Sequence, residues 1–243
     1  MLSKAKIKFI KSLQIKKYRK QEQCFIVEGA KSVRELLASD FEVQTVIGTS
    51  EFLSSITPRP DAEVIEASGK ELQGLGEFQT NDSAVAVARL KSNDNFSIDG
   101  NEYALVLDDI RDPGNLGSII RTADWFGLRK IVASNETADF YNQKVINATM
   151  GSFTRVKMFY TELAIYLDKV NVPIYGAYLD GSDISRVSFG AGGLILIGNE
   201  SKGIGIDLER FVTHRVTIPK VGQVESLNAS IAAGIFCYAI SVR

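Results

Sequence analysis

The sequence predicts two α/β units, the second of them built on a parallel β-sheet that helices cover on both faces. Two observations carry this prediction. Short apolar runs alternate with helical patterns through the second half, and a polar stretch, KSNDNFSIDGN (residues 91–101), separates the halves. Strands buried on both faces are apolar throughout, and helices connect parallel strands. We place a linker in the polar stretch and expect domains at residues 1–95 and 101–243.

The first half predicts a small α/β unit of about 90 residues, a size compatible with an independent domain. It opens with a basic arm, in which Ile7, Ile10 and Leu13 recur at a spacing of three. This spacing predicts a docked helix with its lysines facing outward. We expect strands at residues 24–29, 43–50, 64–67 and 83–90, and a helix at residues 31–37.

The second half alternates more regularly between strands and helices. We expect strands at residues 103–110, 130–134, 173–179, 194–198 and 215–219, and helices at residues 116–126, 141–149, 161–169 and 227–242. Because these strands are apolar throughout and helices separate several of them, a parallel sheet is predicted.

Composition excludes several classes of protein. The hydrophobic fraction of 45% and the charged fraction of 23% are typical of a globular chain with a sizeable core. The sequence contains no run of about 18 apolar residues, so we expect no membrane span. The lysine-rich start lacks the apolar region of a secretory signal. Cys24 and Cys237 have no CxxC spacing, so we expect free thiols in a reducing cytoplasm. A single histidine, His214, cannot form a His/Cys metal site, so no metal mechanism is expected.

The net charge of −1 conceals an asymmetry. Residues 1–20 contain eight basic residues and no acid, so the rest of the chain is acidic overall. A basic arm on an acidic body indicates either a polyanionic partner met at one end or a solvated helix without a partner. Charge alone leaves both open.

Three polar loops follow predicted strands, and ligands of parallel α/β sheets bind at the carboxyl ends of strands. The loops are residues 108–127, 197–205 and 218–230. The second contains GNESKGIG, which matches neither G-x-x-x-x-G-K-[ST] nor G-x-G-x-x-G. Nucleoside triphosphate binding and a nucleotide-dependent oxidoreductase are therefore both disfavoured.

Each polar side chain in these loops also has a purely structural interpretation. Asn115 is a plausible helix N-cap, and capping of the last helix is the commonest explanation for Ser226. Arg121 needs a carboxylate, a phosphate or solvent as its partner. Glu200, directly after a buried strand, fits a cap, an ion pair or a binding site. The residues taken singly leave these alternatives open, whereas three such loops on one sheet favour a site.

The three loops, in this order, resemble the sequence motifs of the SpoU/TrmH family in the SPOUT superfamily. The matching segments are NLGSIIRTADWFG (residues 115–127), ILIGNESKGI (195–204) and IPKVGQVESLNAS (218–230), with NATMGSF (147–153) as a further one. The likeness covers nearly all of residues 103–243. KYRKQEQCFIVEG (17–29) is similar to the RNA-substrate-binding domain of the family.

Members of this family are S-adenosylmethionine-dependent RNA ribose 2′-O-methyltransferases. The resemblance implies a C-terminal trefoil knot, a homodimer and structured RNA as the partner. It implies cofactor binding by the backbone at Gly198, Ile218 and Leu227. It also implies catalytic positions, which are Asn115, Arg121, Glu200, Ser226 and Asn228.

Methyl transfer to a hydroxyl needs alignment and loss of a proton. Because arginine is too basic to accept a proton readily, we expect Arg121 to stabilise the developing alkoxide, with a substrate phosphate as the proton acceptor. Ribosomal RNA is the preferred substrate, because the N-terminal domain resembles that branch of the family. A transfer-RNA ribose methyltransferase and a non-catalytic RNA-binding protein are the alternatives.

Overall fold

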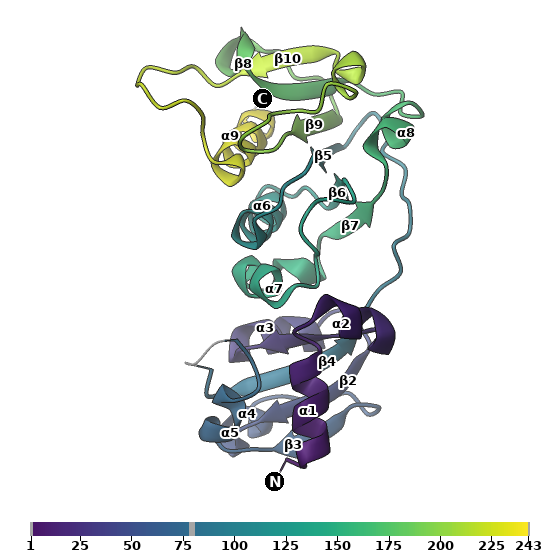
Figure 1. The fold of residues 1–243 in the computed structure, drawn as a ribbon, viewed down its shortest axis with the longest axis vertical. Helices are drawn as coiled ribbons and strands as arrows, with labels where there is room; N and C mark the ends of the chain where they lie inside the picture. The colour runs from purple at the N-terminus through teal and green to yellow at the C-terminus, as the bar shows by residue number, and fades with distance from the viewer. Residues whose placement is uncertain (1, 78–80, 243) are drawn as a thin grey trace. The chain divides into compact units, whose positions relative to one another are not determined.

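The structure, a computed structural model, describes residues 2–77 and 81–242. Two compact units make up the chain (Figure 1). The first contains Met1–Ser92 together with Asp139–Thr154, and the second contains Asn93–Ala138 together with Arg155–Arg243. The segment Asp139–Thr154 thus packs with the N-terminal residues, although it lies within the range expected for the second domain. The domain limits at residues 95 and 101 stay a prediction.

A four-stranded sheet forms the centre of the first unit. Its order is β1-β4-β2-β3, and β4 pairs antiparallel with both β1 and β2, whereas β2 and β3 are parallel. The strands are β1 (Cys24–Glu28), β2 (Val43–Gly48), β3 (Glu63–Glu66) and β4 (Ala84–Arg89). The helices are α1 (Lys4–Ser12), α2 (Lys16–Glu22), α3 (Ala30–Leu37), α4 (Ser50–Ser54), α5 (Gly69–Gln73) and α7 (Gln143–Thr149).

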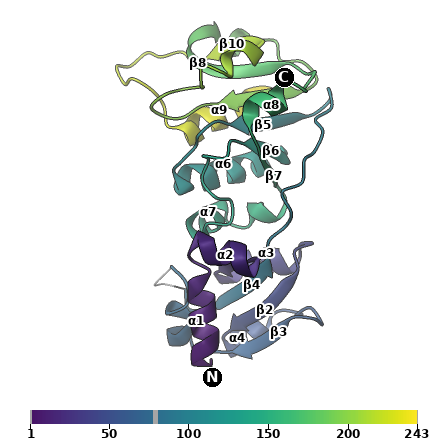
Figure 2. The ribbon, with the colours of Figure 1, turned by 45° about the vertical axis from the view of Figure 1, so that its right-hand side comes forward.

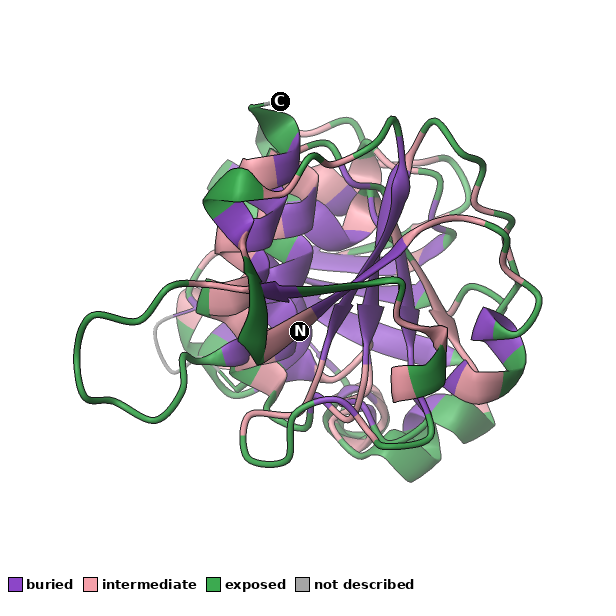
Figure 3. Cartoon of the chain, turned by 90° about the horizontal axis from the view of Figure 1, so that it is seen from above, coloured by how far each residue is buried: buried purple, intermediate pink, exposed green. Residues whose placement is uncertain are grey.

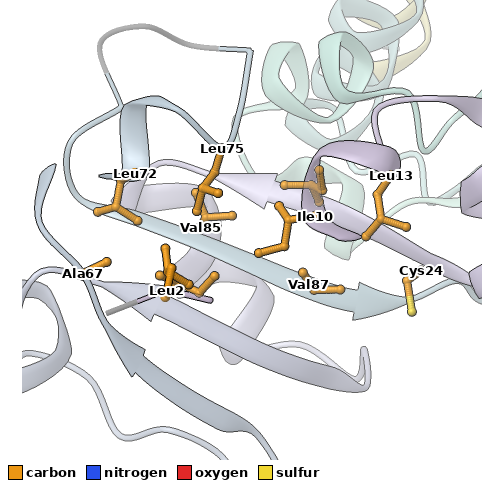
Figure 4. Close-up of a cluster of buried hydrophobic side chains, with 11 residues drawn as sticks. Leu2, Ile10, Leu13, Cys24, Ala67, Leu72, Leu75, Val85 and Val87 are labelled. Carbon is orange, nitrogen blue, oxygen red and sulfur yellow. The ribbon is translucent and has the colours of Figure 1, made fainter. Parts of the chain in front are cut away.

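Helix α1 docks on this sheet through its apolar side chains, as the spacing predicted (Figure 2). Ile10 and Leu13 are at most 1% exposed and pack in one cluster with Val85 and Val87 of β4 (Figure 4). Burial of such side chains stabilises each by about 1.5–3 kcal/mol relative to exposure. The basic arm is not one helix, however, because the chain breaks after Leu13 and resumes as α2.

A six-stranded sheet forms the centre of the second unit. Its order is β10-β8-β9-β5-β6-β7, and all its pairs are parallel, which confirms the predicted sheet. The strands are β5 (Tyr103–Leu107), β6 (Lys130–Ala133), β7 (Lys157–Tyr160), β8 (Ile174–Asp183), β9 (Gly193–Ile197) and β10 (His214–Thr217). The helices are α6 (Pro113–Trp125), α8 (Leu163–Leu167) and α9 (Ala229–Ser241), with short 3₁₀ helices at Ser152–Thr154 in the first unit and at Ile184–Arg186 and Glu209–Phe211 in the second.

Helices cover both faces of this sheet, and its central strands are buried (Figure 3). Leu163 and Leu167 of α8 pack on one face, in a cluster with Val106 and Leu196. Helices α6 and α9 contact one another, and α9 also contacts β9. The described residues contain no helix long and apolar enough to cross a membrane.

Several boundaries differ from those expected. The helix expected at residues 161–169 is the shorter α8, and strand β7 was not predicted at all. All four residues of β7 are partly or fully exposed, and Lys157 interrupts the apolar residues around it, so the chain there lacks the continuous apolar run of β5 and β9. Strand β2 ends before Ser50, because Thr49 caps α4 by accepting a hydrogen bond from the amide of Phe52 at 3.3 Å.

Candidate functional site

The candidate site lies where β5, β9 and β10 end. Parallel strands place their carboxyl ends at one edge of a sheet, so the three polar loops begin at the same edge. After β5 the chain enters α6, after β9 it forms a tight loop, and after β10 it runs through an exposed segment before α9 (Figures 1 and 3).

Helix α6 begins earlier than predicted, and Asn115 is not its N-cap. Asp112 is the cap, because its Oδ1 accepts the Asn115 amide at 2.8 Å, and Pro113 follows in the first turn. An aspartate cap followed by proline is a common helix start, since proline has no amide to leave unpaired. The correction matters for the site, because the Asn115 side chain is then available for other contacts.

Helix α9 begins at Ala229, so the prediction of Ser226 as its N-cap is also wrong. Asn228 is the cap, and its Oδ1 accepts both the amide of Ser230 at 2.8 Å and the hydroxyl of Ser230 at 2.6 Å. Asparagine caps helices as well as serine does. The side-chain Nδ2 of Asn228 therefore points away from the helix with its hydrogens free to donate.

A chain of hydrogen bonds joins one residue from each of the three loops. Nδ2 of Asn115 donates to Oε1 of Glu200 at 2.6 Å, and Nδ2 of Asn228 donates to Oδ1 of Asn115 at 2.8 Å. Asn115 thus acts as donor and acceptor at once, and a bond to a carboxylate is among the stronger kinds. Residues 85 and 113 positions apart in sequence are brought together.

Arg121 and Ser226 take no part in this chain of bonds. Arg121 lies on α6, about 9 Å along the helix axis from Asn115, and is exposed. Within residues 2–77 and 81–242, its guanidinium has neither a hydrogen bond nor an ion pair. Ser226 lies in the exposed segment two residues before the Asn228 cap. Both side chains are therefore available to a bound molecule.

The three expected cofactor residues flank the same edge. Gly198 directly follows β9, half-buried Ile218 directly follows β10, and Leu227 is 40% exposed just before α9. At Gly198 a Cβ atom would lie 2.2 Å from the carbonyl carbon of Gly203, so only glycine fits. Val221 and Val224, in the segment between Ile218 and Leu227, are also largely exposed. Exposed apolar side chains therefore lie on the segment after β10, and the backbone of Gly203 and Ile204 fills the space next to Gly198.

Two further residues of the site escaped the sequence interpretation. Asn199 donates from Nδ2 to the backbone oxygen of Asp109 at 2.9 Å, which links the loop after β9 to the end of β5. Asp109 adopts a left-handed conformation, with φ of 56°. The only signals in the sequence are the paired aspartates at a strand end and an asparagine next to Glu200.

The electrostatics of this edge are set by carboxylates. Burial raises the pKa of the Asp108 carboxyl above its usual value, and the nearby acids Asp207 and Asp109 raise it further. The amide of Gly205 donates to Oδ2 of Asp108 at 2.8 Å and offsets part of this effect. In the part of the chain that the structure describes, no group of three or more His, Cys, Asp or Glu residues is placed to hold a metal ion.

A separate cavity of about 480 Å³ opens at the amino ends of β8 and β10, at the opposite edge of the sheet. Asp168, Asn171, Thr213 and His214 contribute its polar lining. None of the eight predicted site residues lines it, so the polar chain of Asn115, Glu200 and Asn228 is the better candidate for chemistry.

Two family models match the chain. That of the SpoU rRNA methylase family matches residues 102–238, and that of the MRM3-like substrate-binding domain matches residues 4–86. Each match falls within one of the two predicted domains.

The chain is also similar over nearly its whole length to individual proteins. It is 29% identical to a 23S rRNA (guanosine(2553)-2′-O)-methyltransferase, RlmP, of Bacillus subtilis, covering 96% of this chain and 94% of that protein. A solved structure from Porphyromonas gingivalis, assigned to the TrmH family of RNA methyltransferases, is 35% identical with a TM-score of 0.89, covering 98% of each chain. An AdoMet-bound rRNA methyltransferase from Sinorhizobium meliloti is 28% identical with a TM-score of 0.87, covering 98% of this chain and 95% of that one.

Proposed function

The chain belongs to the SpoU rRNA methylase family, as its three motifs predicted, and from this premise we propose that it transfers a methyl group from S-adenosylmethionine to a ribose 2′-hydroxyl of ribosomal RNA. One structural observation supports placing the reaction at this edge of the sheet. The hydrogen-bonded chain of Asn228, Asn115 and Glu200 gathers one polar side chain from each family motif at one edge of the sheet.

The residues at this edge fit the cofactor. S-adenosylmethionine supplies a methyl group on a sulfonium, beside an adenosine with an apolar ring face and polar edges. The exposed side chain of Leu227 and half-buried Ile218 offer apolar contact to such a ring, and the missing side chain of Gly198 lets the backbone of Gly203 and Ile204 pack beside them. We assign cofactor binding to these three residues.

Arg121 is the residue that we assign to stabilising the developing alkoxide. Its guanidinium carries a positive charge, and no carboxylate among the described residues forms an ion pair with it. A preorganised positive charge where negative charge develops is worth about 2.7–4 kcal/mol of barrier in comparable sites. A substrate phosphate is the proposed proton acceptor, because arginine itself cannot take the proton.

The remaining polar residues orient the reactants. Asn115 and Asn228 hold one another through the 2.8 Å bond, and Glu200 fixes the amide of Asn115. Ser226 is exposed beside them and is assigned to the ribose. Alignment of two reactants can contribute several kcal/mol, on the order of 7–11 in the best intramolecular cases.

Ribosomal rather than transfer RNA is the proposed substrate. The relative from Bacillus subtilis that carries a 23S rRNA name matches 96% of this chain, including its N-terminal unit. A solved structure titled for 2′-OH methylation of tRNA covers only 60% of this chain at 22% identity, so it supports the fold alone. We place the substrate contacts in the N-terminal unit, where the substrate-binding model matches.

The proposal is tested by methyl transfer from labelled S-adenosylmethionine to total RNA from cells that lack the gene. We expect 2′-O-methylation at a defined ribosomal nucleotide, and none when that nucleotide carries a deoxyribose. Calorimetry should show binding of S-adenosylmethionine but not NAD. Methylation of transfer RNA alone would favour the alternative substrate. RNA binding without any methyl transfer would favour a non-catalytic protein.

We further propose that two copies of the chain form a homodimer through α6 and α9. Trp125, at the end of α6, is 83% exposed, and α9 exposes Ile231, Tyr238 and Val242 along one face. The rings of Phe126 and Tyr238 lie 6.4 Å apart, so apolar side chains from the two helices meet next to Trp125. Large exposed aromatic side chains are typical centres of protein interfaces.

Light scattering tests the dimer. The wild type should have the mass of two chains, and Trp125→Glu should shift it toward one, because a buried unpaired carboxylate is costly. Ile165→Glu, on the exposed side of α8, is the matched control and should leave the mass unchanged. A wild type that scatters as a single chain at all concentrations contradicts the proposal.

Two properties complete the proposed function. We place the protein in the cytoplasm, because both cysteines are buried free thiols and its proposed substrate is ribosomal. We also propose that the exposed segment after β10 is part of a trefoil knot. The support is that β8 lies between β9 and β10 in the sheet, while α9 returns to contact β9.

A further inference from the structure

The loop after β9 doubles back on itself immediately after the strand. The amide of Asn199 donates to the backbone oxygen of Gly203 at 3.0 Å, and the amide of Gly203 returns a bond to Asn199 at 2.8 Å. Gly203 has a φ of +70°, and Gly198 lies against the backbone of Gly203 and Ile204. Glu200 therefore sits at the first position of a closed turn whose conformation is fixed by its own backbone.

The side chain of Asn199 ties this turn to its surroundings. Its Oδ1 accepts the amides of Ser201 at 2.9 Å and Lys202 at 3.1 Å. These two bonds fix the backbone that directly follows Glu200. Its Nδ2 donates to the backbone oxygen of Asp109 at 2.9 Å, and at 3.4 Å to the Asp109 carboxylate. The side-chain amide of Asn199 thus stabilises the conformation of the turn and also bonds the turn to the residues after β5.

The anchor to which Asn199 is attached is itself held in place. Asp109 lies in the left-handed region, which costs an L-residue about 1–3 kcal/mol and persists only where neighbours enforce it. The amide of Asp109 donates to the hydroxyl of Ser134 at 3.0 Å, and that hydroxyl is 3.2 Å from the hydroxyl of Thr137. The amide of Ile110 also donates to Thr137 at 3.2 Å. The loop after β6 thereby fixes the backbone that receives Asn199.

We infer that Asn199 is a positioning residue for methyl transfer, which sets the place of the Glu200 carboxylate and, through it, of the Asn115 and Asn228 amides. The inference rests on the proposed function. Its physical reason is the 2.6 Å bond from Asn115 to Glu200, which tolerates little displacement of the carboxylate. Misplacement of a catalytic group by about 1 Å can cost about 100-fold in rate.

The test compares Asn199→Ser with Asn93→Ser in methyl-transfer kinetics. Asn93 also donates from Nδ2 to a backbone oxygen, that of Tyr160 at 2.8 Å, but it lies on the exposed surface outside the three motifs. We expect Asn199→Ser to lower kcat by about 10- to 100-fold while the KM for RNA changes much less. The control variant should keep the kcat of the wild type.

A double variant separates positioning from a general loss of stability. If Asn199 acts through Glu200, then Asn199→Ser combined with Glu200→Gln should be no slower than Glu200→Gln alone. The inference is overturned if the kcat losses of the two single variants multiply in the double variant. It is also overturned if the kcat of Asn199→Ser stays within about twofold of the wild type, or if only KM changes.

A second readout does not depend on activity. The side-chain amide of Asn115, observed by nuclear magnetic resonance in the full-length protein, should shift in Asn199→Ser and stay in place in Asn93→Ser. An unchanged Asn115 signal overturns the inference. If the wild type transfers no methyl group, the proposed function is wrong. The Asn115 signal then still tests whether Asn199 positions Glu200.

Discussion

Arg121 differs from a structural arginine, because its guanidinium has no hydrogen-bond or ion-pair partner among the described residues. Its guanidinium is exposed on α6, whereas Asn115 on the same helix is fully engaged with Glu200 and Asn228. A structural arginine usually satisfies its donors within the fold, as buried Arg19 largely does. The free donors of Arg121 are what a phosphate or a developing alkoxide requires.

We predict that Arg121→Ala lowers the single-turnover rate of methyl transfer by about 100- to 1,000-fold, the loss typical of removing one oxyanion donor. Binding of S-adenosylmethionine, measured by calorimetry, should be unchanged. Arg129→Ala, which removes an exposed arginine just before β6, serves as the control and should retain full activity. Near-normal turnover in Arg121→Ala with intact cofactor binding would show that the assignment is wrong.

Asp108 should give the protein a measurable dependence of stability on pH. Burial raises its pKa in the folded state above the ordinary value of 3.8. In the window between the two values the folded state binds more protons than the unfolded state, so the free energy of unfolding falls as pH rises. The stabilisation is complete below the unfolded pKa and is lost as pH rises through the folded pKa.

Asp108→Asn should therefore become more stable relative to the wild type as pH rises from about 4 to about 7. Its side-chain oxygen can still accept the amide of Gly205, so the variant removes the charge and keeps the contact. Urea unfolding at several pH values measures the difference, and exposed Asp61→Asn is the control. Parallel curves for wild type and Asp108→Asn would rule out this pH effect.

At the scale of elements, periodicity and apolar runs predicted the parts of the fold that depend on burial. Strands β5 and β9 are buried at every position, and their continuous apolar runs were sufficient to place them. Strand β7 is half-exposed at the sheet edge, and Lys157 interrupts the apolar residues around it. Exposed strands were therefore recognised unevenly from sequence, because largely exposed β3 was predicted at residues 64–67 and β7 was not.

The contacts of the site divide in a similar way. The polar residues of the three loops were identified from the motifs, because strand ends and loop composition are local features. The bond from Asn199 to Asp109 joins residues 90 positions apart, and its geometry depends on a left-handed backbone at Asp109. The cap of α6 fell on Asp112 rather than Asn115 because both residue types cap helices, and only the following proline distinguishes them.

One buried arginine, Arg19, connects the end of α1 to α2 through contacts that the sequence also did not reveal. Arg19 is 3% exposed, and its guanidinium donates to the carbonyls of Leu13 at 2.9 Å and Gln14 at 2.8 Å, where α1 ends. It also pairs with Asp139 at 2.7 Å, which attaches the segment before α7 to the same point. Arg19 thus satisfies carbonyls directly after α1 and joins three parts of the first unit.

We predict that Arg19→Met lowers the free energy of unfolding by about 2–4 kcal/mol. Breaking a buried pair typically costs about 3–5 kcal/mol, and the remaining 19% exposure of Asp139 reduces that cost. Arg186→Met removes an exposed pair with Asp183 and should change stability by less than about 1 kcal/mol. Urea unfolding measures both, and equal effects of the two variants would contradict the role of Arg19.

For the whole molecule, the distribution of charge matters more than its net value of −1. Eight of the 28 basic residues lie in the first 20 positions, where there is no acid. Lys6 pairs with Glu63 and Arg19 with Asp139. The other six lysines of this arm have no ion pair within the described residues, and all six are exposed on α1 and α2 or directly beside them. Such a surface favours a polyanion, and structured RNA is the polyanion that the proposed function requires.

This distribution predicts how RNA binding depends on salt. Each phosphate contact that releases a counterion steepens the plot of log affinity against log salt by about 0.7–0.9. If Lys16, Lys17 and Lys20 contact phosphates, replacing all three with Gln should reduce the slope by about 2–3 and weaken binding at low salt. The matched control replaces Arg129, Lys157 and Lys169 with Gln, which removes the same charge from exposed positions in the second unit. Net charge changes equally in both variants, so equal slopes in the two would show that only the overall charge matters. A reduced slope in the first variant alone would assign the phosphate contacts to α2.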